Sequence, residues 1–158
     1  MKLIVGLGNP GKEYDMTRHN TGFYCLDVLS DEMNQSIDKE KFKGLYTKFK
    51  YKGEDVILLK PQTYMNNSGE SVAAVMQFFK IPVEDLLVIY DDMDIGTQNF
   101  KRIRVGISKN KLYSVVDWVL GHFSKEEEKL ISEGAKRATE AVLCYLDDSF
   151  NKAMNKYN

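Results

Sequence analysis

The pattern of apolar and polar residues predicts strands and helices that alternate along the chain. Residues 2–7 form a short apolar run typical of a buried strand, and the turn-forming residues 8–11 follow at once. A helix is expected from Thr21, a good N-cap residue, because apolar residues recur behind it at helical spacing. These are Phe23, Leu26, Leu29 and Met33.

A β-hairpin is predicted next. Residues 45–51 alternate between apolar and polar side chains, residues 52–55 have the composition of a turn, and residues 56–59 form a second apolar strand that ends at Pro61. The two strands are therefore expected to pair antiparallel.

After the hairpin, the sequence predicts one helix and then two further strands. Val72, Met76 and Phe79 give this helix one apolar stripe, and Ile81-Pro82 closes it. The apolar residues 86–90 predict a buried strand that runs directly into Asp91-Asp92, and the alternating residues 102–107 predict another strand.

Two helices are expected at the C-terminal end. Ser124 is the predicted N-cap of the first, with Glu127 at the capping-box position. The residues expected on the inner side of this helix are Leu130, Ile131, Ala138, Val142 and Leu143. A last short helix carries Phe150, Met154 and Tyr157.

Together these elements predict an α/β fold. We expect residues 1–158 to form a single three-layer domain, with a twisted mixed β-sheet flanked by helices, because strands alternate with helices and one hairpin is present. No linker or low-complexity stretch divides the 158 residues.

Composition narrows the class of protein. Hydrophobic residues make up 43% of the chain and charged residues 28%, and the longest apolar runs are far too short to span a bilayer. The apolar run at the N-terminus is also too short for a secretion signal, so a cytoplasmic protein is expected. Cys25 and Cys144 lie in apolar helical patterns and are predicted to be reduced, buried thiols.

The charge of the chain is nearly balanced overall but unevenly placed. The formal net charge is −1, yet seven lysines gather in one third of the sequence. They are Lys39, Lys41, Lys43, Lys48, Lys50, Lys52 and Lys60. A second basic group follows at Lys101, Arg102, Arg104, Lys109 and Lys111. Either these residues form a basic face, or the lysines are solvated side chains that protect strand edges.

His19 is the leading candidate for chemistry. It lies at the end of an element, between the first strand and the first helix, where a side chain can reach a substrate. An imidazole suits proton transfer at neutral pH, although a polar residue without chemistry is also common at such a position. The second histidine, His122, is interpreted as structural.

Three predicted loops follow the carboxyl ends of strands, where functional groups of such sheets collect. They contain residues 8–10, residues 63–69 and Asp91-Asp92. If they converge, His19 gains a carboxylate that fixes its tautomer and leaves the other ring nitrogen free to take a proton from water. Asn side chains can donate to a developing oxyanion.

Other interpretations of these loops are less favoured. Residues 6–11 match GxGxxG, but Pro10 lacks an N–H group and no helical pattern follows, which argues against a dinucleotide site. Asp91, Asp92 and Asp94 with His19 could hold Mg²⁺ or Zn²⁺, or the acids could simply form a turn.

Several separate motifs, in order along the chain, carry a family resemblance. They are residues 3–11, Tyr14 with residues 17–23, residues 60–69, Tyr90 with Asp91-Asp92, residues 100–107 and residues 115–123. In this combination the chain resembles the bacterial peptidyl-tRNA hydrolase family over nearly its whole length.

The resemblance implies hydrolysis of the ester that joins a peptide to the 3′ end of tRNA, without a metal or other cofactor. It implies that His19 is the general base, that Asp91 orients it, and that Asn9 distinguishes a blocked α-amino group from a free one. Tyr14, Tyr64 and Asn66 are implied to contact the peptidyl-adenosine end of the substrate.

The same resemblance makes peptidyl-tRNA the expected partner of a monomer. The lysine-rich hairpin and the strand with Arg102 and Arg104 become candidates for contacts with RNA phosphates. Turn chemistry remains an alternative for Asn66 and Asn67.

The chain departs from the family after Ile95. The family carries there another strand and a Gly-Gly-His-Asn-Gly segment that opens a helix, whereas here Ile95 passes straight to residues 96–99. The Gly-Arg-Pro stretch expected after Ile107 is also altered. A catalytically impaired relative that binds RNA or peptide with the same fold is therefore the alternative function.

Overall fold

A computed structural model describes residues 1–92, 101–107 and 119–157 of the chain. Its described strands form one mixed sheet with the order β2-β3-β4-β1-β5-β6. These strands are β1 (Lys2–Gly6), β2 (Lys39–Lys41), β3 (Gly44–Tyr51), β4 (Glu54–Pro61), β5 (Leu86–Asp92) and β6 (Lys101–Gly106). Strand β1 pairs in parallel with β4 and β5, β6 is parallel to β5, and β3 is antiparallel to both β2 and β4. The predicted α/β class and mixed sheet are confirmed.

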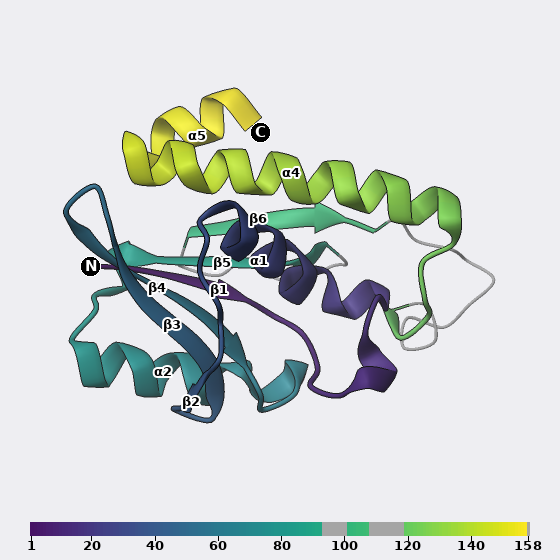
Figure 1. The fold of residues 1–158 in the computed structure, drawn as a ribbon, viewed down its shortest axis with the longest axis horizontal. Coiled ribbons are helices and arrows are strands. Elements are labelled where there is room, and N and C mark those ends of the chain that lie inside the picture. The colour runs from purple at the N-terminus through teal and green to yellow at the C-terminus, as the bar shows by residue number, and fades with distance from the viewer. Residues whose placement is uncertain (93–100, 108–118, 158) are drawn as a thin grey trace.

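Helices cover both faces of this sheet. They are α1 (Thr21–Glu32), α2 (Ser68–Phe79), α4 (Lys125–Asp147) and α5 (Phe150–Tyr157). Helices α1 and α4 lie on one face, α2 lies on the other, and α5 packs along α4 (Figure 1). The predicted three layers are therefore present.

Alternate residues of the central strands divide the core between the two faces. In β1, Ile4 packs with Leu26 and Val142 on the side of α1 and α4, whereas Leu3 and Val5 belong to the cluster on the side of α2. This alternation follows from the two-residue repeat of a strand. A sheet that is buried on both faces explains why β1 is a continuous apolar run and does not alternate with polar residues.

The predicted hairpin is present, and its turn has a specific geometry. Lys52 and Gly53 both have positive φ angles, 49° and 85°, as the type I′ turn of a two-residue hairpin requires. The third strand of this antiparallel unit, β2, was not predicted. It has three residues, all exposed, so no apolar repeat marks it in the sequence.

The start of α4 agrees with its predicted capping box. The Glu127 N–H donates to Ser124 Oγ, and the Ser124 N–H donates to Glu127 Oε1, each at 3.2 Å. The prediction for Leu130 was wrong, because its side chain is 67% exposed. Each helical residue turns about 100°, so Leu130 lies beside the buried stripe that begins at Ile131.

Other local predictions need correction. Thr21 is the first residue of α1 and not its cap, and its hydroxyl donates to the Arg18 carbonyl. Asp91 and Asp92 are the last residues of β5 and not a loop behind it. Cys25 is buried, but Cys144 is only partly buried; both are free thiols. Among the described residues, no helix has the length and apolar character needed to cross a membrane.

Candidate active site

Close backbone packing brings the start of α1 to the ends of β1 and β5. The Leu7 N–H donates to the Ile89 carbonyl at 3.0 Å, and the Phe23 N–H donates to the Leu7 carbonyl at 3.2 Å. Gly22 lies at this crossing, where an added Cβ would approach the Ile89 oxygen to 2.4 Å. Only glycine fits here, and its absence of a side chain lets the turn with His19 lie over the carboxyl end of β5.

His19 and Asp91 form the chemical centre of this region. His19 lies in a single 3₁₀ turn, Arg18–Asn20, and its Nδ1 is 2.8 Å from Asp91 Oδ2. The Asp91 side chain is only 2% exposed, whereas that of His19 is 23% exposed. Because a carboxylate can only accept, Nδ1 carries the proton, which leaves Nε2 as an acceptor. This arrangement can remove a proton from a water molecule.

Asn9 is fixed beside this pair by two other loops. Its Oδ1 accepts a hydrogen bond from the Met65 N–H at 2.7 Å. Asn20 holds the Asn9 backbone, accepting from the Asn9 N–H at 2.7 Å and donating to the Asn9 carbonyl at 2.9 Å. Since Met65 N–H can only donate, the side-chain atom that faces it is the oxygen, so the Asn9 NH₂ group is directed away from Met65. Asn20 is a residue whose role the sequence did not predict.

Of the remaining predicted substrate contacts, Tyr14 is partly buried, whereas Tyr64 and Asn66 are exposed on either side of Met65. The rings of Tyr14 and Tyr64 meet edge to face, with centroids 6.4 Å apart. Tyr64 is 53% exposed and has φ 63° and ψ 158°, a conformation that is strained for a residue with a side chain. Asn66 is exposed in the short 3₁₀ turn Met65–Asn67. Strain at an exposed tyrosine is typical of a functional loop.

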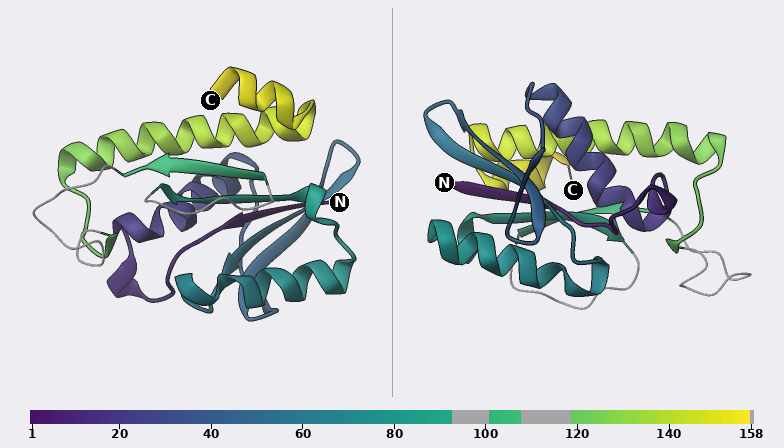
Figure 2. Two further views of the ribbon diagram at one scale, coloured as in Figure 1. Left: turned by 180° about the vertical axis from the view of Figure 1, so that it is seen from behind. Right: turned by 60° about the horizontal axis from the view of Figure 1, so that its bottom comes forward.

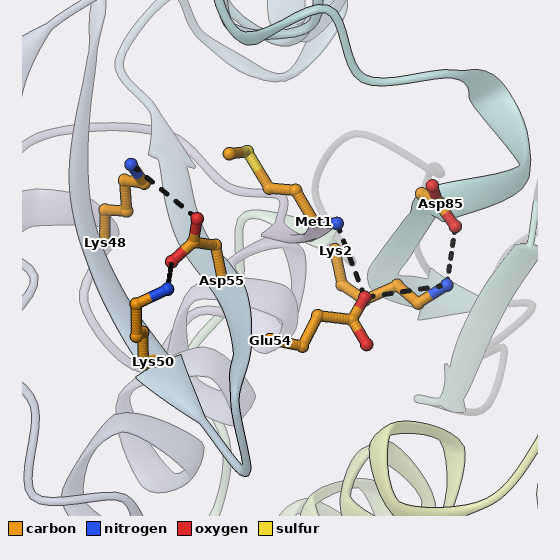
Figure 3. A network of polar contacts seen from close by, with 7 residues as sticks. All are labelled: Met1, Lys2, Lys48, Lys50, Glu54, Asp55 and Asp85. Carbon is orange, nitrogen blue, oxygen red and sulfur yellow. Dashed lines mark hydrogen bonds and ion pairs between the residues drawn. The ribbon is translucent and has the colours of Figure 1, made fainter.

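Many lysines of the hairpin region are paired with acids. Lys50 and Lys48 flank the Asp55 carboxylate at 3.1 and 4.0 Å (Figure 3). Lys43 contacts Glu70 at 3.1 Å. These pairs favour the interpretation of solvated lysines for this part of the hairpin.

Two further lysines of this group are also paired with acids. Lys52 contacts Asp147 at 2.7 Å and Lys60 contacts Asp27 at 2.8 Å. Arg102 is partly buried and Arg104 is exposed on β6.

Three of the charged residues named in the predictions lie outside the described part of the chain. They are Lys109 and Lys111 of the second basic group and Asp94 of the possible metal site. Within the ranges that the structure describes, no three His, Cys, Asp or Glu side chains gather as they would around a metal ion.

Comparisons with known proteins identify the family. The family profile described as Peptidyl-tRNA hydrolase matches residues 3–96 and 94–158. The chain belongs to the peptidyl-tRNA hydrolase family. A peptidyl-tRNA hydrolase from Lactobacillus gasseri is 45% identical, and one from Bacillus anthracis is 44% identical, each over all of this chain and all of the relative.

Solved structures of the family share the fold. A crystal structure of peptidyl-tRNA hydrolase from Acinetobacter baumannii has a TM-score of 0.90 at 33% identity and covers 100% of this chain and 94% of that one. The alignments to the Lactobacillus and Bacillus relatives run over 186 and 185 positions, although this chain has 158 residues. The relatives therefore contain positions without a counterpart here, and the two stretches of the family match meet at residues 94–96.

Proposed function

We propose that the chain hydrolyses the ester that joins a peptide, or an N-blocked aminoacyl group, to the 3′ end of tRNA, and so recycles tRNA from peptidyl-tRNA released early. The 2.8 Å contact between His19 Nδ1 and Asp91 Oδ2, at the carboxyl end of the sheet, carries this proposal. Membership of the family supports it. The comparisons give no support to the alternative, a catalytically impaired relative that only binds RNA or peptide.

His19 acts as the general base in this proposal. Its Nε2 takes a proton from water while the water oxygen attacks the ester carbonyl carbon. The tetrahedral intermediate then expels the 3′ oxygen of the ribose, which receives the proton from Nε2. Asp91 keeps Nδ1 protonated and stabilises the imidazolium that exists between the two transfers. No metal or other cofactor takes part in these steps.

Asn9 recognises the blocked end of the substrate. Because its Oδ1 is engaged by Met65, its NH₂ group is available as a donor to a peptide carbonyl. An unblocked aminoacyl group lacks that carbonyl, so it leaves this donor unsatisfied. A buried donor without a partner lowers affinity, and this difference selects N-blocked substrates.

Aromatic and polar groups around Asn9 hold the nucleotide end. The exposed Tyr64 ring and its edge-to-face neighbour Tyr14 offer a surface for adenine, and Asn66 offers hydrogen bonds. Arg102 and Arg104 of β6 are proposed phosphate contacts, together with lysines of the hairpin region whose surface ion pairs are weak enough to exchange for a phosphate.

We also infer the domain organisation, oligomeric state and location of the protein. Residues 1–158 form a single domain that acts as a monomer in the cytoplasm. We also infer that the strand and Gly-Gly-His-Asn-Gly helix of the family are absent. Two observations support this absence: the family match divides at residues 94–96, and only eight residues separate β5 from the parallel strand β6. Parallel crossovers usually take a dozen or more residues.

The test compares two substrates that differ in one group. The chain should release N-acetyl-amino acid from N-acetyl-aminoacyl-tRNA and leave the unblocked aminoacyl-tRNA largely intact, with or without a chelator. Binding of the blocked substrate without cleavage would instead select the binding-only alternative. Activity that is lost with the chelator and restored by a divalent metal would reject the metal-free mechanism.

A further inference from the structure

The segment before His19 is paired with the segment that leads into α4. Thr17 and His122 face each other in an isolated antiparallel bridge, and the Arg18 N–H donates to the Gly121 carbonyl at 3.0 Å. Figure 2 shows this segment beside the turns that precede α1. Parts of the chain about one hundred residues apart are thus joined one residue before His19.

A partly buried side-chain contact strengthens the same junction. Arg18 Nη2 donates to both carboxylate oxygens of Glu127, at 2.9 and 3.1 Å, and its guanidinium lies 5.7 Å from the centroid of the Phe123 ring. The Arg18 side chain is 7% exposed. Burial alone would raise the pKa of Glu127, but hydrogen bonds from Ser124 and from Arg18 lower it, so Glu127 is a carboxylate at neutral pH. The Glu127 side chain is 32% exposed, so the buried member of the pair is Arg18, and removing Glu127 takes a carboxylate away from a buried guanidinium.

His19 therefore lies between two fixed neighbours. Arg18 is held by α4 and the segment before it, and Asn20 is held by Asn9. Within the described part of the chain, the His19 ring makes one hydrogen bond, to Asp91, and it is partly exposed. A partly exposed ring with one bond keeps its direction only if its backbone does not move.

We propose that Arg18 and Glu127 are positioning residues that hold the His19 ring against Asp91, so that the N-terminus of α4 sets the geometry of the active site. The inference rests on the proposed function for its kinetic test, but not for its spectroscopic one. Neither residue touches the reacting atoms. A loosened pair lets the 3₁₀ turn shift, which lowers the fraction of time that Nε2 points at the attacking water.

Three variants separate positioning from helix stability. Glu127→Ala removes the carboxylate that Arg18 Nη2 contacts. Ser124→Ala removes the hydroxyl half of the same capping box but leaves the Arg18 contact. Glu128→Ala removes a neighbouring, exposed acid from the first turn of α4. If Glu127 acts only through the helix, Ser124→Ala should reproduce its effect.

Kinetics should distinguish the three. In Glu127→Ala we expect kcat for N-acetyl-aminoacyl-tRNA to fall about tenfold or more, with KM changed by less than about twofold. The reason is that a small misplacement of a catalytic group slows the chemical step of ester hydrolysis. Ser124→Ala and Glu128→Ala should keep kcat within about twofold, as most surface substitutions do. Equal losses in Glu127→Ala and Ser124→Ala, or no loss in Glu127→Ala, would overturn the proposal.

Proton NMR gives a readout that does not need activity. The His19 Nδ1–H bonded to Asp91 should give a downfield resonance, identified by its absence in His19→Ala. It should broaden or vanish in Glu127→Ala and persist in Ser124→Ala and Glu128→Ala. An unchanged resonance in folded Glu127→Ala would overturn the inference. If the native chain is inactive but the His19 Nδ1–H resonance still changes only in Glu127→Ala, the proposed function is rejected and the positioning role stands.

Discussion

Asp91→Asn tests how much the carboxylate contributes to His19. In the native contact His19 Nδ1 donates a charge-assisted hydrogen bond of 2.8 Å to Asp91, whose side chain is 2% exposed, so water cannot replace it. Hydrogen bonds to charged groups contribute roughly 1.5–3 kcal/mol. At about 1.36 kcal/mol for each factor of ten, losing this bond to the imidazolium should lower kcat by about 10- to 150-fold.

The tautomer adds to this loss. No group among the described residues bonds to Asp91 Oδ1, so an asparagine can turn either its oxygen or its NH₂ group toward His19. The NH₂ orientation makes Nδ1 the acceptor and places the proton on Nε2, which then cannot accept one from water. We therefore expect the effect to appear in kcat and not in substrate binding.

The assay is hydrolysis of N-acetyl-aminoacyl-tRNA at saturating substrate, with circular dichroism to show that the variant is folded. Asp85→Asn is the matched control, because Asp85 binds Lys2 beside the start of β5, at the opposite end of that strand from Asp91 (Figure 3). The control should stay within about twofold of the native rate. A folded Asp91→Asn protein that keeps more than about a third of native kcat would refute the reasoning, since even the lower estimate predicts a greater loss.

Three further predictions concern stability and reactivity. Leu58→Ala, at a fully buried position of β4, should lower the free energy of unfolding by about 2–5 kcal/mol in urea denaturation, whereas Leu130→Ala on the exposed side of α4 should change it by less than about 0.5 kcal/mol. Burial raises the pKa of Cys25 to about 12, so in a Cys144→Ser background a thiol reagent at neutral pH should modify Cys25 only as fast as the protein unfolds; rapid labelling of native protein would contradict this. The contact with Arg18 and the capping hydrogen bonds lower the folded-state pKa of Glu127 below its ordinary 4.5, so its contribution to stability is full above pH 4.5 and is lost as the pH falls through the lower folded value. The difference in unfolding free energy between the native chain and Glu127→Gln should therefore shrink as the pH is lowered. A difference that stays constant with pH would be inconsistent with the Arg18 contact.

The sequence predicted most of the fold because each central element carries a strong periodic signal. The apolar run of β1, the alternation in β3 and the capping box at Ser124 each specify one local structure. The missed strand β2 has no buried residue, so its pairing with β3 depends on tertiary contacts that a short window cannot contain. Leu130 was misassigned because an apolar residue adjacent to a buried stripe looks like part of it.

The site was less accessible to prediction. Residue types and the order of motifs pointed to His19, Asp91 and Asn9, but their distances depend on how the chain crosses at Gly22. The contact between Arg18 and Glu127 was not foreseeable, since the two residues lie 109 positions apart and Glu127 already had a complete local explanation as a capping residue. Asn20 likewise makes its contacts with a loop eleven residues earlier, which no periodicity marks.

The most direct test of the account is single-turnover hydrolysis of N-acetyl-aminoacyl-tRNA by the native chain and by His19→Ala, with NMR spectra to show that both are folded. Loss of a general base typically costs about 10²–10⁴-fold in rate, so the native chain should cleave the ester and the variant should be slower by at least about 10²-fold. Equal rates for the two proteins, or no cleavage by a folded native chain, would contradict the account.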